Sequence, residues 1–143
     1  MEDLFSETLY RDEFMWIRAA KMHSILWVIR SSAPYKTLSD ASATVDGMRG
    51  LLNRGVSATK LLFDTRLVPL RSDPTFEEFS RKHFDPLLAR FAHVAILVAT
   101  ATGKLQLNRI RRENGGTFEV FASFDEAVVH LQKASTQGAV NKR

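Results

Sequence analysis

Cysteine is absent from this sequence, and so is any long apolar run. Without cysteine the chain forms no disulfide, offers no thiol nucleophile and builds no thiolate metal site. No stretch approaches the roughly 20 consecutive apolar residues with which a helix crosses a bilayer. Residues 1–5 are acidic and have neither the basic start nor the apolar core of a secretory signal. We therefore expect a cytoplasmic protein without a membrane span.

Long runs of charge of one sign are missing as well. The 143 residues are 45% hydrophobic and 25% charged, which is typical of a single globular domain. We expect that domain to span residues 1–134 and the polar residues 135–143 to form a flexible tail. The net charge of +4 is not gathered into one basic segment, so nucleic acid is an unlikely partner.

What the sequence does contain is an alternation of apolar, strand-like runs with amphipathic, helix-like ones. The strand-like runs are residues 14–20, 25–30, 60–65, 94–100 and 118–122. This order predicts an α/β fold in which an N-terminal antiparallel hairpin is followed by strand-helix units, with about five strands in a mostly parallel sheet. Residues 4–10 form a lead-in that is compatible with a further strand.

The predicted hairpin turns at the polar residues 21–24. If Ala20 pairs with His23, Trp16 lies opposite Trp27 and both indoles share one face of the sheet. Exposed apolar side chains on either face would form a larger patch than a monomer usually tolerates. We therefore predict a homodimer, or a site for an apolar ligand or a protein partner, on one face of the hairpin, with these residues: Phe14, Trp16, Trp27 and Ile29.

Capping boxes mark the start of two predicted helices. Thr37 is followed three residues later by Asp40, and Ser123 is followed at the same spacing by Glu126. Each pair precedes apolar residues at spacings of three and four, which is the pattern of a helix with one buried face. The first of these helices ends at Gly55, a typical residue beyond a helix C-terminus.

A third helix is predicted between the strand at 60–65 and the strand at 94–100. Asp73 fits its N-cap, and Pro74 fits the first helical position. Pro86 removes a helical hydrogen bond, so the helix should kink or restart near Asp85.

Residues that usually carry catalysis or bind metals do not form a recognisable group. The histidines have no partner at metal-ligand spacing, and no serine lies in a Gly-x-Ser-x-Gly turn. The adjacent Glu77 and Glu78 lie in the first turns of a predicted helix, where the helix dipole favours negative charge. We expect no enzymatic activity, no metal and no cofactor.

Residues 100–104 superficially resemble a phosphate-binding loop because they follow an apolar strand and open a helix. The first glycine of that motif is missing, and Leu105 replaces the Ser or Thr that would hold magnesium. A helix N-terminus with a lysine can still attract an anion, which makes Thr102, Gly103 and Lys104 anion-binding candidates. The basic residues that follow in 104–112 are more typical of a solvated helix face than of a nucleic-acid site.

Several segments together resemble the STAS or SpoIIAA-like family. They are the hairpin, the strand 61–64 with its loop and capped helix, the run 91–98 and the terminal 121–127. The resemblance covers residues 14–134 and rests on pattern and short segments. It implies a SpoIIAA-like fold with helices mainly on one face of the sheet. It also implies a non-enzymatic bacterial module that either regulates a partner or binds a lipid-like or other small ligand.

Anti-sigma-factor antagonists of that family carry Asp-Ser-Ser-Gly at the end of the loop after this strand, with a serine as phosphate acceptor. An ungapped match from Asp64 places residues 72–75 there, so Asp73 falls on the acceptor position and the motif is absent. The resemblance nevertheless makes the loop a regulatory candidate, with these residues: Asp64, Arg66, Ser72, Asp73 and Thr75. The alternative is that Asp73 simply caps the helix.

Two functional hypotheses follow. The first is a cytoplasmic bacterial signalling module that acts by protein-protein contact through the surface around the loop 64–75 and the following helix. The second is a small-ligand or lipid-binding protein that uses the aromatic face of the hairpin. An enzyme on the same scaffold is a third and weaker hypothesis, because no nucleophile, base and orienting group can be assembled from the sequence.

Overall fold

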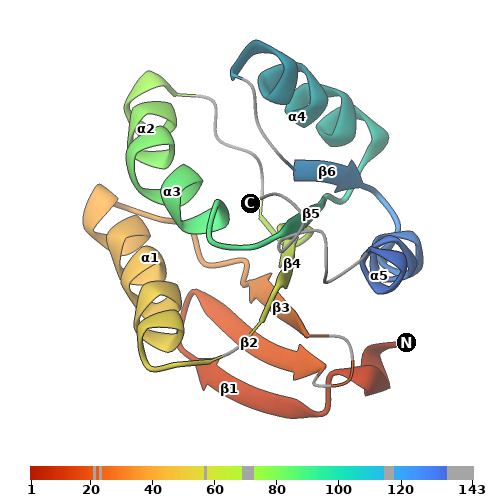
Figure 1. Cartoon of the computed structure of the whole chain (residues 1–143). Coiled ribbons are helices and arrows are strands. Elements are labelled where there is room, and N and C mark those ends of the chain that lie inside the picture. Colours follow the sequence, from red (N-terminus) through yellow and green to blue (C-terminus); the bar gives the residue numbers. More distant parts are fainter. Residues whose placement is uncertain (21, 23, 57, 69–72, 115–117, 135–143) are drawn as a thin grey trace.

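The computed structural model describes residues 1–20, 22, 24–56, 58–68, 73–114 and 118–134. Its centre is one six-stranded mixed sheet whose strands follow each other in chain order (Figure 1). The strands are β1 (Glu7–Arg11), β2 (Met15–Ala20), β3 (Ile25–Arg30), β4 (Lys60–Asp64), β5 (His93–Leu97) and β6 (Phe118–Phe121). β1, β2 and β3 pair antiparallel, whereas β3, β4, β5 and β6 pair parallel. The α/β class, the N-terminal hairpin and the parallel strands that follow are thus confirmed.

The sheet has one strand more than the five predicted from the sequence. β1 has partly polar residues and lies at the edge of the sheet, where one backbone side has no partner strand. A short, polar edge strand does not show the apolar run by which the other strands are found in the sequence. The lead-in at residues 4–10 therefore contributed a strand that the pattern left ambiguous.

The hairpin register differs from the predicted one by two residues. Ala20 pairs with Ile25, so Trp16 lies opposite Ile29 and Trp27 lies opposite Arg18. The connection between the strands is longer than the pattern suggested, and its residues 21 and 23 lie outside the described residues. Because side chains alternate with a period of two, a shift by two residues leaves both indoles on the same face.

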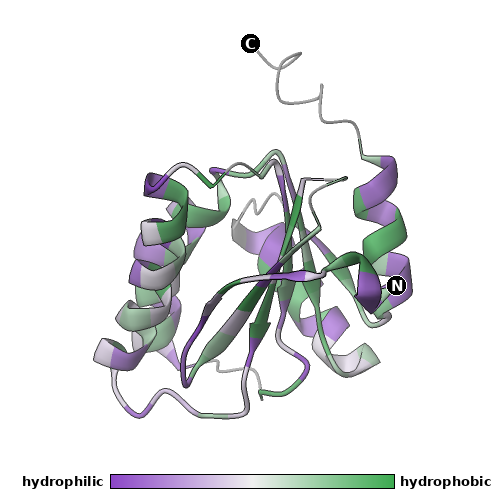
Figure 2. Ribbon diagram, turned by 90° about the horizontal axis from the view of Figure 1, so that it is seen from below, coloured by the Kyte–Doolittle hydropathy of each residue, from purple (hydrophilic) through white to green (hydrophobic). Residues whose placement is uncertain are grey.

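Helices cover both faces of the sheet (Figure 2). The helical elements are η1 (Glu2–Leu4), α1 (Leu38–Asn53), α2 (Pro74–Phe79), η3 (Ser80–Phe84), α3 (Asp85–Leu88), α4 (Ala101–Asn114) and α5 (Phe124–Lys133). α1, α2, η3 and α3 contribute to one apolar cluster with the inner face of β2 to β6, and α4 lies on the same side. Right-handed crossovers between parallel strands in sequential order place all connecting helices on that one face.

α5 packs on the opposite face. Its apolar side chains join a second cluster with Trp27, Leu62 and Leu97 of the strands and with Phe5 of the N-terminal segment. The face that a purely one-sided arrangement would leave open is therefore covered by the last helix and by the start of the chain. α5 also has the predicted cap, since the Ser123 hydroxyl accepts the backbone N–H of Glu126 at 3.3 Å.

The other predicted helix boundaries are confirmed. α1 begins after the capping box of Thr37 and Asp40. The helix that begins at Pro74 changes at Ser80–Phe84 to a π-helical turn, and α3 starts with Pro86 in its first turn. Pro86 cannot donate a backbone hydrogen bond, and the wider turn before it accommodates this loss.

We predict opposite effects for two glycine substitutions near the end of α1. Gly55 has φ +91°, so Gly55→Ala forces a side chain into the left-handed region and should destabilise the protein by about 1–2 kcal/mol. Gly50 lies inside the helix, where an added Cβ meets only the flexible end of Arg54 at 3.3 Å. Gly50→Ala should stabilise by about 0.5–1 kcal/mol. Urea unfolding of both variants checks the signs, and equal effects would contradict the assigned end of α1.

Candidate functional site

A cleft of about 510 Å³ lies on the main helical face of the sheet. It separates α2, η3 and α3 on one side from α4 on the other, and Figure 1 shows these two groups of helices standing apart above the strands. The sheet forms the floor with Phe63 of β4, Ile96 of β5 and Phe118 of β6. The helical walls add these apolar side chains: Phe76, Phe84, Leu88, Leu107 and Ile110.

The cleft exists because α4 is a polar helix that packs on the last strand. None of residues 101–113 is fully buried, and Leu105 points into solvent with 70% of its surface exposed. Leu107 and Ile110 remain as its large apolar side chains toward the sheet, and both line the cleft. A helix with so narrow an apolar stripe cannot fill the space between itself and α3.

Charged side chains surround the mouth of the cleft. Arg109 pairs with Glu113 one helical turn later, at 4.0 Å. On the opposite wall partial burial raises the pKa of Asp85, and the positive charge of Arg81, one turn earlier, opposes that shift. Arg81, Arg109 and Glu113 are exposed, so water screens their charges strongly.

Arg30, by contrast, is buried. It stands at the end of β3, lines the cleft and exposes only 6% of its surface. Its Nε donates to the Phe14 carbonyl at 3.0 Å, and its Nη2 donates to the Ala33 carbonyl at 3.2 Å. The guanidinium lies 4.0 Å from the centre of the Tyr35 ring. Burial lowers the pKa of Arg30, but an arginine side chain stays cationic in proteins.

Tyr35 supports this arginine as a neutral phenol. Its hydroxyl donates a hydrogen bond to the Thr44 hydroxyl of α1 at 2.8 Å. Burial raises the pKa of Tyr35, and the bond to Thr44 and the nearby Arg30 oppose that shift. The ring therefore presents its π face to the cation while α1 fixes its orientation.

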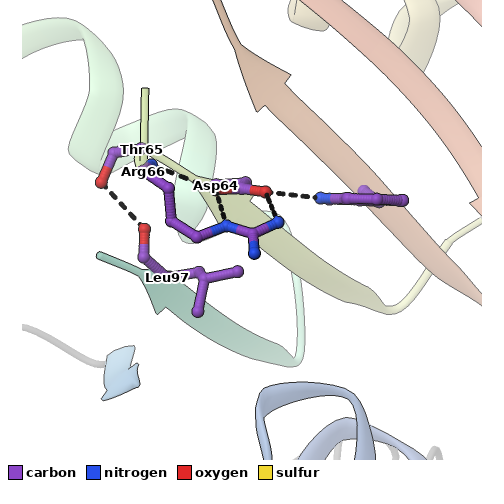
Figure 3. Close-up of polar contacts among 5 residues, drawn as sticks. Asp64, Thr65, Arg66 and Leu97 are labelled. Atoms are coloured by element: carbon purple, nitrogen blue, oxygen red, sulfur yellow. Dashed lines mark hydrogen bonds and ion pairs between the residues drawn. The ribbon is translucent and has the colours of Figure 1, made fainter. Parts of the chain in front are cut away.

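Asp64 and Arg66, two regulatory candidates, are joined to each other on the α5 side of the sheet (Figure 3). Asp64 is 2% exposed and accepts from Arg66 Nη2 at 2.8 Å, from Arg66 Nε at 3.0 Å and from Trp27 Nε1 at 3.1 Å. The hydrogen bond to Asp64 raises the pKa of Arg66. The arginine also lies 5.5 Å from the Phe124 ring of α5. This network connects β3, β4 and α5, which gives both residues a structural role.

The remaining loop candidates lie at the start of α2. Asp73 Oδ1 accepts the backbone N–H of Phe76 at 2.9 Å, so the predicted capping role is confirmed. Thr75 is exposed in the first turn of the same helix. Ser72 lies outside the described residues, and phosphorylation of the loop stays a prediction.

The anion-binding candidates Thr102, Gly103 and Lys104 form the first turn of α4. The Thr100 hydroxyl accepts the Gly103 N–H at 3.0 Å, and the Thr100 carbonyl accepts the Lys104 N–H. These two backbone donors are therefore already satisfied within the chain. Anion binding at this turn stays a prediction.

The predicted aromatic face is largely closed. Trp27 is 2% exposed and contacts the rings of Phe5 at 5.1 Å and Phe124 at 4.7 Å, while Ile29 packs partly buried against the same cluster. Trp16 stays half-buried on this face and lies between the guanidinium groups of Arg11 and Arg18.

Phe14 was assigned to this face wrongly. It packs on the other side of the sheet, 5.4 Å from the Tyr35 ring. The reason is local: β2 begins only at Met15, and the Asp12 carboxylate accepts the backbone N–H of Phe14 at 2.8 Å. The strand alternation therefore does not extend back to Phe14.

Sequence reasoning missed the cleft residues, Arg30 and Tyr35 above all. The available signal was a charged residue directly after five apolar residues in β3, at a strand end where parallel sheets often bind ligands. Leu107 and Ile110 lie within residues 104–112, whose basic side chains indicated a solvated helix face, and they form part of the cleft wall.

Metal ligands and membrane spans are not found within the described ranges. No group of three or more His, Asp or Glu side chains there is arranged to hold a metal ion. No helix there combines the length and the apolar character that a bilayer crossing requires.

We predict that Asp64→Ala is strongly destabilising because it leaves the buried Trp27 N–H and Arg66 without their acceptor. The expected loss is about 2–4 kcal/mol in the free energy of unfolding. Asp73→Ala is the matched control, since it removes one helix cap and should cost about 1 kcal/mol. Denaturant unfolding measures both. An Asp64→Ala variant as stable as the control would contradict the structural role of Asp64.

Comparison with known proteins gives no match to a family model, to a curated protein or to a solved structure. The SpoIIAA-like resemblance therefore stays a prediction from short segments. The geometry of the cleft and of its polar residues is the basis for any functional conclusion.

Proposed function

We propose that this protein is a non-enzymatic binding module whose cleft holds a small organic ligand with an apolar body. The observation that carries this proposal is the open cavity of about 510 Å³ between α2, η3 and α3 on one side and α4 on the other. Small-molecule sites typically have about 300–1,000 Å³ and mainly apolar walls with few polar groups. The volume of this cleft lies in that range and its floor is apolar, while six charged residues also line it: Arg30, Glu77, Arg81, Asp85, Arg109 and Glu113.

The aromatic lining favours a flat or chain-like apolar group. Phe63 and Phe84 lie 6.1 Å apart between the floor and one wall, and Tyr35 and Phe76 lie 6.1 Å apart near the end of β3. Water in such a lining makes few hydrogen bonds, so an apolar ligand that displaces it gains free energy.

Binding without bond-making agrees with how two of the four hydroxyl groups that line the cleft, those of Tyr35 and Thr65, are used. The Tyr35 hydroxyl donates to Thr44, and the Thr65 hydroxyl donates to the Leu97 carbonyl at 2.9 Å. Both groups therefore stabilise the fold. The proposal keeps the ligand-binding hypothesis from the sequence but moves the site to the opposite face of the sheet.

Regulation through protein contact around the loop 64–75 has less support. Asp64 and Arg66 form an ion pair with each other, and Asp73 caps α2. Asp64, Arg66 and Asp73 thus already have structural partners, whereas phosphorylation of Ser72 or Thr75 stays a prediction.

We predict that the neutral fluorescent probe N-phenyl-1-naphthylamine binds in the cleft and that Leu107→Trp weakens this binding. The larger side chain fills the cavity from α4, and the dissociation constant should rise by roughly tenfold or more, about 1.4 kcal/mol. Leu105→Trp is the matched control, because Leu105 lies on the same helix with its side chain in solvent. Fluorescence titration measures all three proteins.

Amide chemical shifts locate the probe independently. Shifts concentrated at Phe63, Ile96 and Leu107 support the cleft. Equal weakening by both tryptophan variants, shifts confined to the α5 face, or no binding by the wild-type protein would overturn the proposal.

A further inference from the structure

We infer that the ligand of the cleft carries a carboxylate head group that binds Arg30, with its apolar chain extending toward α4. This inference rests on the proposed function and adds the chemical class of the ligand. It depends on the unusual position of Arg30, a buried cation at one end of an apolar cavity.

The guanidinium of Arg30 has N–H groups that are not used by its hydrogen bonds to the Phe14 and Ala33 carbonyls. A guanidinium carries five N–H groups, and the bonds to the Phe14 and Ala33 carbonyls use two of them. Within the described part of the chain, Arg30 has no ion-pair partner, and the acidic group that influences it is Asp12, acting through space. A buried charge without a counter-ion is costly, so binding of an anion would recover free energy.

Asp12 does not form an ion pair with Arg30, because its carboxylate oxygens accept hydrogen bonds from other groups. Its Oδ1 accepts the backbone N–H groups of Phe14 and Met15, and its Oδ2 accepts the Tyr10 hydroxyl at 2.7 Å. The Asp12 carboxylate therefore favours the charged form of Arg30 and leaves the remaining guanidinium N–H groups available.

The exposed arginines of the rim do not offer the same site. Arg109 is paired with Glu113, and Arg81 has Asp85 beside it. Their charges are screened by water, whereas a carboxylate beside Arg30 would form charge-assisted hydrogen bonds in a less polar environment.

The polar and apolar parts of the cleft are arranged to suit an amphipathic chain, with Arg30 at one end and α4 at the other. Arg30 is on β3 and Phe118 is on β6, three strand spacings or roughly 14 Å apart across the sheet and, by the register, four residues or roughly 13 Å apart along the strands, which gives a separation of roughly 19 Å. Between these ends the floor consists of Phe63 and Ile96. A chain whose head lies at Arg30 would thus contact apolar side chains until it reaches α4.

A single negative charge fits better than two. Arg30 is the buried cation of the lining, whereas Arg81 and Arg109 lie beside Asp85 and Glu113, and Glu77 adds a further negative charge. One negative charge on the ligand is therefore balanced by Arg30, but the second charge of a phosphate monoester would have no further buried cation to balance it. The geometry therefore favours a carboxylate.

The test measures displacement of N-phenyl-1-naphthylamine from the wild-type protein by four ligands with the same twelve-carbon chain: dodecanoate, dodecanol, dodecyl phosphate and dodecylamine. We expect dodecanoate to bind at least about tenfold more tightly than dodecanol, and dodecylamine to bind most weakly. Because all four ligands meet the same folded protein, this series does not depend on the stability of any variant.

Variants then assign the head group to Arg30. Arg30→Met should reduce the preference for dodecanoate over dodecanol to about onefold to threefold, while Arg109→Gln, the control at the rim, should keep it. If Arg30→Met does not fold, Arg30→Lys retains the charge and should keep part of the preference.

The outcomes separate the two proposals. Equal binding of dodecanoate and dodecanol, tighter binding of dodecyl phosphate, or an unchanged preference in a folded Arg30→Met variant would overturn the carboxylate assignment and leave an apolar-ligand site in place. Failure of the wild-type protein to bind the neutral probe and dodecanol would overturn the proposed function itself.

Discussion

The sequential order of the parallel strands is the constraint on which the rest of this structure depends. Because β3, β4, β5 and β6 are neighbours in chain order, their right-handed crossovers place every connecting helix on one face. The other face would be left to solvent without the last helix, so α5 and Phe5 have to cover Trp27 and Leu62. The Asp64 network then ties β3 and β4 to the arginine that contacts α5. The Asp64–Arg66 pair thus helps to hold α5 against the sheet.

The same constraint explains why the cleft lies where it does. α1 crosses between β3 and β4 and buries a full apolar stripe, including Ala41, Val45 and Met48. α4 makes the last crossover, covers an edge strand and has few apolar residues to bury. α1 thus has five buried side chains, whereas none of residues 101–113 in α4 is buried. Space that remains beside a polar helix at the edge of a sheet is accessible from outside, which suits a binding site better than a core.

Much of the fold could be predicted from the sequence because its signals are local. The caps at Thr37, Asp73 and Ser123 fix where helices begin, and Pro86 marks a break. The hairpin register was wrong by two residues because a turn decides it, and the strands alone do not. Phe14 was assigned to the wrong face because Asp12 bends the chain before β2 begins. The cleft was missed because its size depends on how far apart α3 and α4 pack on the sheet. That spacing is a tertiary property, which no single stretch of sequence encodes.

The amphipathic character of the cleft comes from segments that are far apart in the chain. Arg30 ends the hairpin, and its side chain is fixed by the Phe14 carbonyl and by the ring of Tyr35, which lies between β3 and α1. Leu107 and Ile110 come from the last crossover helix. Each segment alone has an ordinary interpretation, a charged strand end or a weakly amphipathic helix. The sheet brings these segments together. α4 packs on β6, three strands from β3, so Arg30 and the apolar side chains of α4 become the polar and apolar ends of one site.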